Sequence, residues 1–537
     1  MEDTVHGSED NSQDPTTANL PPIPENAKVQ VEDDVTGRQA SITYHDCLKQ
    51  LGEYLVLPVN MCNAKDSHTK VECGAPRPFE VNIKSRGTAA ILEWLCPHGH
   101  TVWKWSSQPT FKYGMLAGDF MLACNILLSG NNYAKISLLF KFMKMGMVDR
   151  SSFFRIQDTY CVDTIKDFWN DKRAEIITKL QSKGPIVAQG DARMDSPGFC
   201  AQYCTYTTME NKSKQIIYMV NIDKRETMRN SVVMEKEGFI RTFDTLRGEL
   251  NVTEICTDAH AQISALFNKG KYKDSGVQHT LDIWHGSKNL SKKIHAAGQQ
   301  KGCAILRIWN KDICNHFWYC CKTADTYEEF IDIWMGLLHH VTGEHTWALG
   351  ECQHGPLVER REEWIESGSV AHDRLTEIIL DGRWLKGVPK YLRFRSTAEL
   401  ESFHNHILMY ASKRFSFSPP VYAARTMLAG LDYNHHVHRQ ARRKADGTIQ
   451  YGKVYNKKSR KWSLYSVKVE KDYSYIVDLQ NAIVRQRLSS EGMPRRRTRR
   501  PDDPRQHGVL SGVPAPTTEE LLQIQVSRGI GQSLPKD

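Results

Sequence analysis

Two apolar runs in this chain each lead to an aspartate. One covers residues 186–188 and continues to Asp191 in GDARMDSPG, and the other is NVTEICTD, which ends at Asp258. Short apolar runs bounded by turn residues are typical of buried strands, so each strand is expected to present a carboxylate at its end. Carboxylates are the ligands that hard divalent cations such as Mg²⁺ prefer. The pattern therefore predicts a metal site at Asp191 and Asp258.

A helix predicted over residues 396–413 supplies a third carboxylate. Ser396 and Glu399 have the spacing of a capping box, which predicts the helix N-cap at Ser396. Because Glu399 would then be used in the cap, Glu401 is the carboxylate left over, and His404 follows it one turn later. An apolar stripe beside Glu401 predicts the face that packs on the rest of the domain: Leu400, Phe403, Ile407 and Ala411.

These three carboxylates suit the cleavage of a phosphodiester bond. Two divalent ions about 3.5–4 Å apart stabilise the charge that grows on the entering and leaving oxygens, and carboxylates hold such ions. We expect Asp191 to bridge the two metals, and Asp258 and Glu401 to bind one each. Each aspartate also has a structural alternative, since Asp191 could be a turn residue and Asp258 a helix N-cap. Asp195 lies at the Ser-Pro-Gly turn and is assigned to shaping a hairpin.

The elements around the aspartates predict an α/β fold. Strand-like runs at 186–191, 199–209 and 215–223 form a meander, and after a helix a further strand ends at Asp258. A short helix at 261–267 and a strand at 278–284 come next. Three antiparallel strands, a helix and a parallel strand are the order of an RNase H-like mixed sheet. In that order the ends of the first and fourth strands lie side by side.

Together these residues resemble a known class, the eukaryotic cut-and-paste DDE transposases. The carboxylates are separated by 67 residues (258 − 191) and 143 residues (401 − 258), with a long insertion before the last, as in that class. Asp282 and His285, in DIWH, are similar to its Asp/Cys-x-x-His signature. The GDxRxDSPG-like start, the TAELESFHN helix and the LDYN segment at 431–434 look most like the Kolobok-type branch.

The resemblance implies an activity, cofactors and partners. The activity would be cleavage and strand transfer of DNA, by phosphodiester hydrolysis and transesterification, with Mg²⁺ or Mn²⁺ as cofactor. Double-stranded DNA would be the partner, bound by a homodimer or higher oligomer in the nucleus. The catalytic and metal-binding residues would be Asp191, Asp258 and Glu401, with Asp282, His285 and His404 as supporting residues.

Composition and periodicity divide the chain into regions. Residues 111–180 carry three helical segments, one with an apolar face of Ile136, Leu139, Phe140 and Met143, and this unit could dock a helix in DNA or simply pack on a neighbour. The expected regions are a disordered acidic tail (1–39), a small β-rich, zinc-ribbon-like module (40–110), the helical unit (111–180), the catalytic core (181–300 and 393–440), a large helical insertion (301–392) and a basic, largely flexible C-terminal region (441–537).

Cysteines and histidines gather in two of these regions. In the β-rich module Cys62, Cys73, Cys96 and His100 are candidate ligands for Zn²⁺, with His98 nearby, although chance cysteines in a small core are an alternative. The helical insertion carries a second group, for which a zinc site and helical core packing are both open: Cys314, His316, Cys320, Cys321, His339, His340, His345, Cys352 and His354.

Charge and hydropathy limit the partners. The 537 residues carry a formal net charge of +9, compatible with a polyanionic partner, and basic clusters occupy 432–444, 456–461 and 495–500. These clusters would contact phosphates, although a solvated surface, or a nuclear import signal at RRRTRR, is the alternative. We find no apolar run of about 20 residues, so no membrane partner is expected. The cysteines are expected to be reduced thiols or metal ligands.

Two other functions are weighed against an active transposase. Many relatives begin with a zinc-coordinating THAP domain, whereas this chain begins with an acidic stretch. That departure favours a domesticated, catalytically inactive DNA- or chromatin-binding protein, or an end recognition carried by the cysteine module and the helical unit. A nuclease acting on RNA hybrids is the third alternative, in which the insertion and the Asp282–His285 pair would have no role.

Overall fold

The computed structural model describes residues 27–527, except 37–42, 44, 58, 66–69, 349, 356–362, 458–459 and 493–498. The chain forms two compact units. The first comprises Met1–Thr164 and Tyr473–Arg497, and the second comprises Ile165–Asp472 and Thr498–Asp537. In the described part of the chain, no helix combines the length and the apolar composition needed to cross a bilayer.

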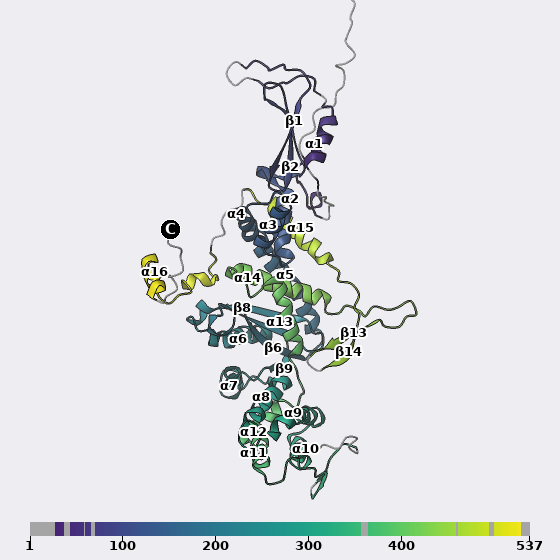
Figure 1. Ribbon diagram of the computed structural model, residues 1–537, viewed down its shortest axis with the longest axis vertical. Coiled ribbons are helices and arrows are strands. Elements are labelled where there is room, and N and C mark those ends of the chain that lie inside the picture. Colours follow the sequence, from purple (N-terminus) through teal and green to yellow (C-terminus); the bar gives the residue numbers. More distant parts are fainter. Residues whose placement is uncertain are drawn as a thin grey trace, which may run out of the picture. The chain divides into compact units, whose positions relative to one another are not determined.

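The first unit contains a three-stranded antiparallel sheet in the order β1-β2-β3. The strands are β1 (Glu80–Arg86), β2 (Ala89–Leu95) and β3 (Thr101–Ser106), with α1 (His45–Tyr54) before them (Figure 1). Its core is built on Leu57, Val81, Leu92 and Trp94. A short ribbon of β4 (Thr110–Phe111) and β5 (Met115–Leu116) follows.

Three helices of this unit lie where the sequence predicts them: α2 (Ala117–Leu128), α3 (Tyr133–Phe142) and α4 (Arg150–Ile156), followed by α5 (Val162–Gln181), which continues into the second unit. The apolar face predicted for α3 is only partly right. Leu139 and Met143 are 49% and 47% exposed, and α3 buries no residue. The helical period is as predicted, but this face is only partly covered, since Ile136 and Phe140 are half-buried.

The chain ends depart from the expected disorder. Residues 1–26 and 37–39 of the acidic tail lie outside the described residues. Residues 27–36 do not behave as a disordered tail, because Val29 is buried and its N–H donates to the Thr110 carbonyl at 2.9 Å. The C-terminal region is also more regular than expected: it contains β13 (Tyr451–Asn456), β14 (Lys461–Ser466), α15 (Ser474–Leu488) and α16 (Thr518–Ser527). Helix α15 buries Leu479, Ile483 and Val484, a periodicity that the basic composition of the region obscured.

The second unit is built on a five-stranded mixed sheet in the order β10-β9-β6-β7-β8. Its strands are β6 (Ile186–Met194), β7 (Tyr203–Glu210), β8 (Ile216–Asp223), β9 (Val252–Thr257) and β10 (Gln278–Leu281). The pairs β6–β7 and β7–β8 are antiparallel, whereas β6–β9 and β9–β10 are parallel. This is the strand order that the sequence predicts.

Three boundaries differ from the prediction. Strand β7 begins at Tyr203 and not at 199, because Gly198–Cys200 form a 3-10 turn. Strand β6 continues through Asp191 to Met194, so Asp191 lies within the strand, opposite Thr207, and not at its tip. Strand β10 ends at Leu281, and the predicted strand to 284 is wrong there, because Asp282 caps α8 (Ile283–Ala297) by accepting a hydrogen bond from the Trp284 N–H. The apolar residues of the DIWH segment therefore serve a helix.

Helices cover both faces of this sheet (Figure 1). On β7, the Tyr206 ring contacts Phe239 of α6 (Ser231–Glu249), whereas the Thr205 hydroxyl lies 3.1 Å from Tyr422 Oη of α14 (Pro419–His436). Since successive side chains of a strand point to opposite faces, α6 and α14 lie on opposite sides. Helix α13 (Ala398–Tyr410) packs against β6 and β7 next to α14, and α7 (Ala261–Asn268) follows β9.

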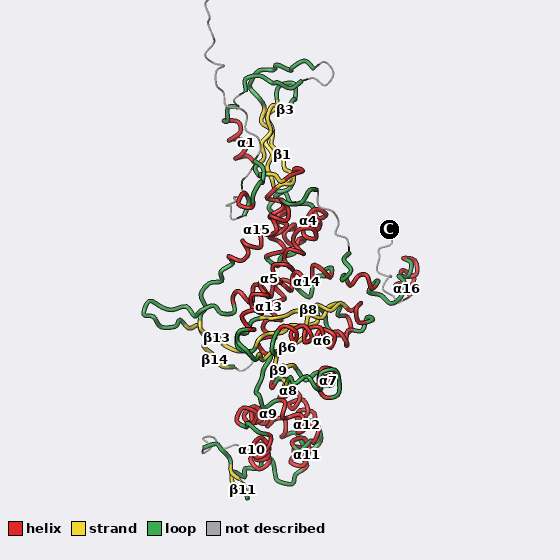
Figure 2. The backbone as a smooth tube through the Cα atoms, turned by 180° about the vertical axis from the view of Figure 1, so that it is seen from behind, coloured by secondary structure: helices red, strands yellow, loops and turns green. Residues whose placement is uncertain are grey.

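The insertion between α8 and α13 is mainly helical (Figure 2). It contains α9 (Ile305–Thr323), α10 (Tyr327–His340), α11 (Val370–Ile379), α12 (Gly382–Gly387) and a small ribbon of β11 (Thr346–Trp347) and β12 (Gly350–Glu351). Its core is aromatic, with Trp309, Phe317 and Trp334 almost fully buried. Cys320 and Cys321 also lie in this core. For these two residues the alternative of core packing therefore holds.

Candidate active site and metal centre

The parallel strands β6 and β9 bring Asp191 and Asp258 to neighbouring positions. Gln189 pairs with Cys256, and the same register carried two residues further aligns Asp191 with Asp258. Because Asp191 and Thr207 are paired, the Asp191 side chain lies on the sheet face of Thr205, which is the face covered by α14.

Asp282 continues this row directly after β10, the next parallel strand. Its N–H donates to the Thr257 carbonyl at 2.9 Å, directly before Asp258. Asp282 is 1% exposed, and its Oδ2 accepts hydrogen bonds from Thr397 Oγ1 at 2.9 Å and from His285 Nδ1 at 2.8 Å. The carboxylate is therefore saturated by its neighbours and orients His285, as expected of a supporting residue.

The two candidate catalytic aspartates are buried and repel each other. Burial raises the pKa of Asp191 well above its usual value, and the charges of Asp258 and then Glu235 raise it further. Burial also raises the pKa of Asp258, which the positive charges of His285 and His260 partly offset. Two partly desolvated carboxylates of like charge are the arrangement that a bound cation stabilises.

Glu235, on α6, is a further carboxylate close enough to Asp258 to influence its charge, and the sequence prediction missed it. Burial and then the charge of Asp258 raise the pKa of Glu235 to about 8. Its Oε2 lies 3.9 Å from His260 Nε2, two residues after Asp258. A signal was present in the sequence, because Glu235 precedes Phe239 by four residues and thus falls on the apolar face of the helix.

His404 contacts Asp191 from α13. Its Nδ1 lies 3.4 Å from Asp191 Oδ2, and its Nε2 is buried without a hydrogen-bond partner among the described residues. Burial, and then the positive charges of Arg193 and Lys413, lower the pKa of His404 to about 3. The imidazole is therefore neutral at physiological pH and can donate only one N–H, which suits a residue that orients Asp191.

Glu401 lies on α13 one turn before His404, in the first turn of the helix, and its side chain is exposed. The predicted capping box is wrong: Thr397 is the N-cap, and Glu399 forms an ion pair with Lys214 at 3.4 Å. Although Thr397 occupies the N-cap position, its side chain does not bond to the helix N-terminus, because its hydroxyl donates to Asp282. Residues three apart share a helix face, so Glu401 projects on the side of α13 that carries His404.

Asp195 has the hairpin role that the sequence indicates. Its Oδ1 accepts hydrogen bonds from the Gln202 and Tyr203 N–H groups at 3.0 and 3.2 Å. These bonds hold the turn between β6 and β7. The Asp195 carboxylate is therefore occupied by backbone N–H groups of the hairpin.

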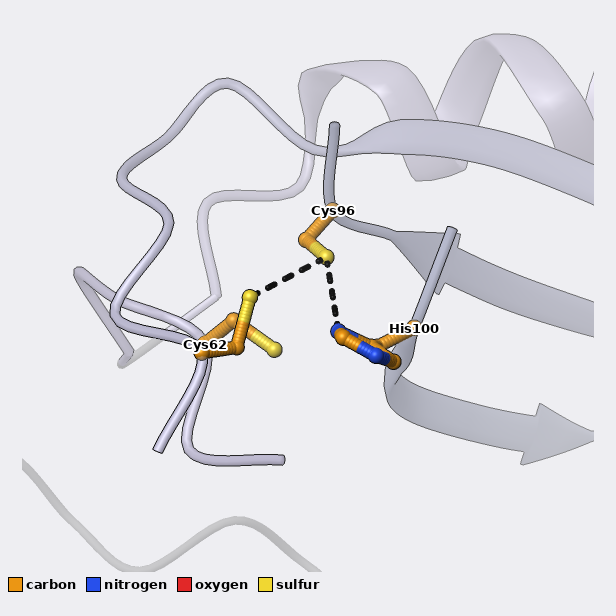
Figure 3. Close-up of side chains that lie close together, drawn as sticks. Cys62, Cys96 and His100 are labelled. Atoms are coloured by element: carbon orange, nitrogen blue, oxygen red, sulfur yellow. Dashed lines mark hydrogen bonds between the residues drawn. The ribbon is translucent and has the colours of Figure 1, made fainter. Parts of the chain in front are cut away.

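A separate cluster of ligand types lies in the first unit. The Sγ atoms of Cys62, Cys73 and Cys96 and a ring nitrogen of His100 lie within 4.8 Å of one another, and Figure 3 shows Cys62, Cys96 and His100 converging. Cys96 Sγ is 3.9 Å from Cys73 Sγ and 3.6 Å from His100 Nδ1. His98 lies beside the cluster, with Nδ1 3.1 Å from Cys73 Sγ.

The pKa of the Cys96 thiol is lowered, which favours the thiolate. Burial alone would raise its pKa, but hydrogen bonds from the backbone of His100 and His98 and from the other two thiols outweigh burial and lower the pKa to about 7. A thiolate is the form that binds a soft or borderline metal. The sheet and the loop before it thus bring the four predicted ligands together. Cys62, Cys73 and Cys96 are eleven or more residues apart in the sequence.

Comparisons with known proteins give little beyond this geometry. No family model matches the chain, and no curated protein matches it. One solved structure that is similar to part of the chain is the HTLV-2 integrase catalytic core domain in complex with magnesium, in its trimeric form. The identity is 13%, the match covers 26% of this chain and 87% of that chain, and the TM-score is 0.14. At this TM-score the likeness carries no weight for the function.

Proposed function

We propose that this chain is a divalent-metal-dependent DNA-processing enzyme of the DDE type, in which Asp191, Asp258 and Glu401 hold the cations. One observation carries the proposal. Asp191 lies on β6 and Asp258 directly follows the parallel neighbour β9, and burial, followed by the charge of Asp258, raises the pKa of Asp191. The two carboxylates repel each other when both are ionised, and bound divalent cations would offset this repulsion.

The strand order supports an RNase H-like fold for the second unit. The order β10-β9-β6-β7-β8, with α6 between β8 and β9, is the order expected of that fold. Along the sequence, the helical insertion lies between the last strand of this sheet and α13, as the resemblance to DDE transposases implies. The placement near the Kolobok-type branch is supported by the sequence motifs alone.

The residues of the chain would have separate roles in catalysis. Bound Mg²⁺ or Mn²⁺ would stabilise the charge on the entering and leaving oxygens of the phosphodiester. Asp191 and Asp258 would hold the cations, and His404 would orient Asp191 through the 3.4 Å contact. Asp282 would orient His285, whose pKa is raised first by its hydrogen bond to Asp282.

Partners and location belong to the same proposal. The substrate would be double-stranded DNA, held by a homodimer or higher oligomer because two DNA ends must be joined, and the enzyme would act in the nucleus. The net charge of +9 supports a polyanionic substrate. Of the basic clusters, most of RRRTRR and part of the 456–461 segment lie outside the described residues.

The module of Cys62, Cys73, Cys96 and His100 would bind Zn²⁺ as a structural ion. At the usual Zn–S and Zn–N lengths, a tetrahedral site separates two sulfurs by about 3.8 Å and a sulfur from a nitrogen by about 3.6 Å. The distances of 3.9 and 3.6 Å around Cys96 Sγ are close to these values. A folded module of this kind is a candidate for recognising transposon ends.

The activity is tested by cleavage of duplex DNA in the presence of Mg²⁺ or Mn²⁺. Asp191→Asn, Asp258→Asn and Glu401→Gln should each abolish cleavage while leaving DNA binding in place. Asp274→Asn, at an exposed aspartate in the segment before β10, is the matched control and should cleave like the wild type. Normal cleavage by any of the three variants removes that residue from the proposed triad.

The same assay separates the alternatives. A wild-type chain that binds duplex DNA but cleaves none with either cation would favour the domesticated, inactive protein. Preferential cleavage of an RNA–DNA hybrid would favour the nuclease alternative. Cleavage of duplex DNA with subsequent joining of the ends supports the transposase-like activity.

A further inference from the structure

Four of the nine candidate histidines and cysteines in the helical insertion converge at one end of it. Ligand atoms of His340, His345, Cys352 and His354 all lie within 4.8 Å of one another. His340 is the last residue of α10, His345 precedes β11, and Cys352 and His354 follow β12. The cluster therefore joins the end of a helix to a two-stranded ribbon that has little core of its own.

The distances in this cluster are close to the edges of a tetrahedron. His340 Nδ1 lies 3.4 Å from Cys352 Sγ and 3.3 Å from His354 Nε2. Around a zinc ion, a nitrogen and a sulfur ligand are about 3.6 Å apart and two nitrogens about 3.4 Å apart. Both separations are thus those of ligands that share one small cation.

The protonation of the rings also favours a cation. His354 Nδ1 lies 2.7 Å from the Gly355 carbonyl, which requires that this nitrogen carries the proton and leaves a lone pair on Nε2. That lone pair points at His340 Nδ1, which the Cys352 sulfur approaches as well. One proton on His340 Nδ1 cannot serve both neighbours well, whereas a cation between them would accept all three lone pairs.

His345 supplies an independent observation. Its Nδ1 is buried and has no hydrogen-bond partner among the described residues. Buried ring nitrogens are almost always paired, and an exception indicates a water or an ion. The ring is held in place by edge-to-face contacts, with ring centroids 5.1 Å from His340 and 5.6 Å from Trp364.

We propose that His340, His345, Cys352 and His354 form a structural Zn²⁺ site that fixes the β11–β12 ribbon to the end of α10. Four protein ligands complete a tetrahedron and leave no open position for substrate, so the site is structural and not catalytic. Three imidazoles and one thiolate suit Zn²⁺ better than Mg²⁺ or Ca²⁺, which prefer oxygen. The His354–Gly355 hydrogen bond has the form expected of a ligand histidine, whose second nitrogen donates to a carbonyl.

The test measures bound zinc in the purified full-length chain. With both clusters occupied, the wild type should contain about two zinc ions per chain, one for each group. Cys352→Ser and His345→Ala should each lose one zinc, and Cys96→Ser should lose the other. His354→Cys, which keeps a zinc ligand at the position, should retain the full content. Replacement of zinc by Co²⁺ should give visible absorption bands of a tetrahedral site, with a sulfur-to-cobalt band that is weakened by Cys352→Ser.

His339→Ala is the matched control. His339 precedes His340 but is used elsewhere, since its Nδ1 lies 2.6 Å from Glu344 Oε2 and its ring stacks on Trp347. It should keep the wild-type zinc content. The proposal is overturned if Cys352→Ser and His345→Ala bind as much zinc as the wild type, or if the Cys96→Ser chain contains none. Because zinc content is measured without DNA, failure of the proposed DNA cleavage would leave this result intact.

Discussion

Glu235 and Glu401 are both candidates for the third metal ligand of the proposed active site. Glu235 is half-buried beside Asp258 and has a strongly raised pKa, whereas Glu401 is exposed on the helix that supplies His404. The resemblance to DDE transposases favours Glu401, whereas the raised pKa of Glu235 beside Asp258 favours Glu235. Both can act if Glu235 binds or positions a cation directly and Glu401 closes the site from α13.

Replacing Glu235 by Gln should weaken binding of Mn²⁺ by about 10–100-fold, the effect typical of residues next to the primary ligands. The reason is that burial and the charge of Asp258 disfavour the ionised form of Glu235, whereas a bound cation would favour that form, and glutamine cannot ionise. Isothermal titration calorimetry of the full-length chain measures the affinity. Glu237→Gln, two residues along α6 and paired with Arg241, is the control. An unchanged Mn²⁺ affinity for Glu235→Gln would exclude Glu235 from the metal site.

Asp432 on α14 is the centre of a buried ionic network that supports α13. Its Oδ2 accepts a hydrogen bond from Lys471 Nζ at 2.9 Å. Its carboxylate oxygens also lie 2.7 Å from His406 Nε2 and 2.8 Å from His436 Nδ1. Burial alone would raise the pKa of Asp432, but the hydrogen bonds from His406 and Lys471 outweigh it and hold the pKa well below its usual value. The LDYN segment thus serves the fold by anchoring the helix that carries His404.

Asp432→Asn should lower the free energy of unfolding at pH 7 by about 3–5 kcal/mol, because it leaves buried cations without their partner. A carboxylate whose folded pKa is lowered contributes stability above its unfolded pKa, and this contribution is lost as the pH falls. The difference between variant and wild type should therefore narrow below about pH 4. Urea unfolding at several pH values measures it, with Asp332→Asn as control. A difference that does not depend on pH would contradict the ionic role.

At the scale of elements, the approach of β6 to β7 explains Gly190. A Cβ at this position would lie 2.4 Å from Tyr206 Oη and 3.0 Å from the Tyr206 ring. The Tyr206 ring is fully buried against α6, so it has little room to move. The glycine directly before Asp191 is thus required by close packing between strands, and the same packing sets the position of the neighbouring carboxylate.

Gly190→Ala should destabilise the second unit by about 1–3 kcal/mol, the usual cost of overpacking a core. In a Tyr206→Phe background the cost should be smaller, because the atom in closest contact is removed. Tyr206→Phe itself should cost little, since Tyr206 Oη is buried without a hydrogen-bond partner among the described residues. Chemical unfolding measures all three variants. Gly248→Ala, in open space on α6, is the control, and equal costs in both backgrounds would refute the contact.

At the scale of the whole molecule, the charge balance predicts how DNA binding responds to salt. The net charge of +9 includes the basic cluster of Arg442, Arg443 and Lys444, and all three residues are exposed. Each phosphate that a protein neutralises releases counterions, so the logarithm of the binding constant falls with the logarithm of the salt concentration.

The affinity of the full-length chain for duplex DNA should fall by about 10³-fold between 50 and 200 mM salt if roughly six phosphates are contacted. Neutralising Arg442, Arg443 and Lys444 together should weaken binding and reduce the slope by about 2–3. Fluorescence anisotropy at several salt concentrations measures both effects. Binding that is insensitive to salt, or a slope that the triple variant does not change, would remove phosphate contacts by this cluster.

The sequence by itself determined the elements of the five-stranded sheet and the position of its acids along them. Strand order, the aspartates at Asp191 and Asp258, and the apolar stripe of α13 arise from local residue types and periodicity, which short-range physics controls. Boundaries were less well predicted. Strand β6 extends past Asp191 because it pairs with β7. Helix α13 has Thr397 at its N-cap without a side-chain capping bond, because the Thr397 hydroxyl donates to Asp282 instead.

Only the tertiary structure decided which polar side chains meet. It added Glu235 to the carboxylate site, and it selected His340, His345, Cys352 and His354 from nine candidates in the insertion while placing Cys320 and Cys321 in the apolar core. The reason is geometric. Convergence of ligand atoms depends on contacts between elements that are distant in the sequence, and residue spacing along one chain does not encode the direction in which a side chain points after the elements have packed.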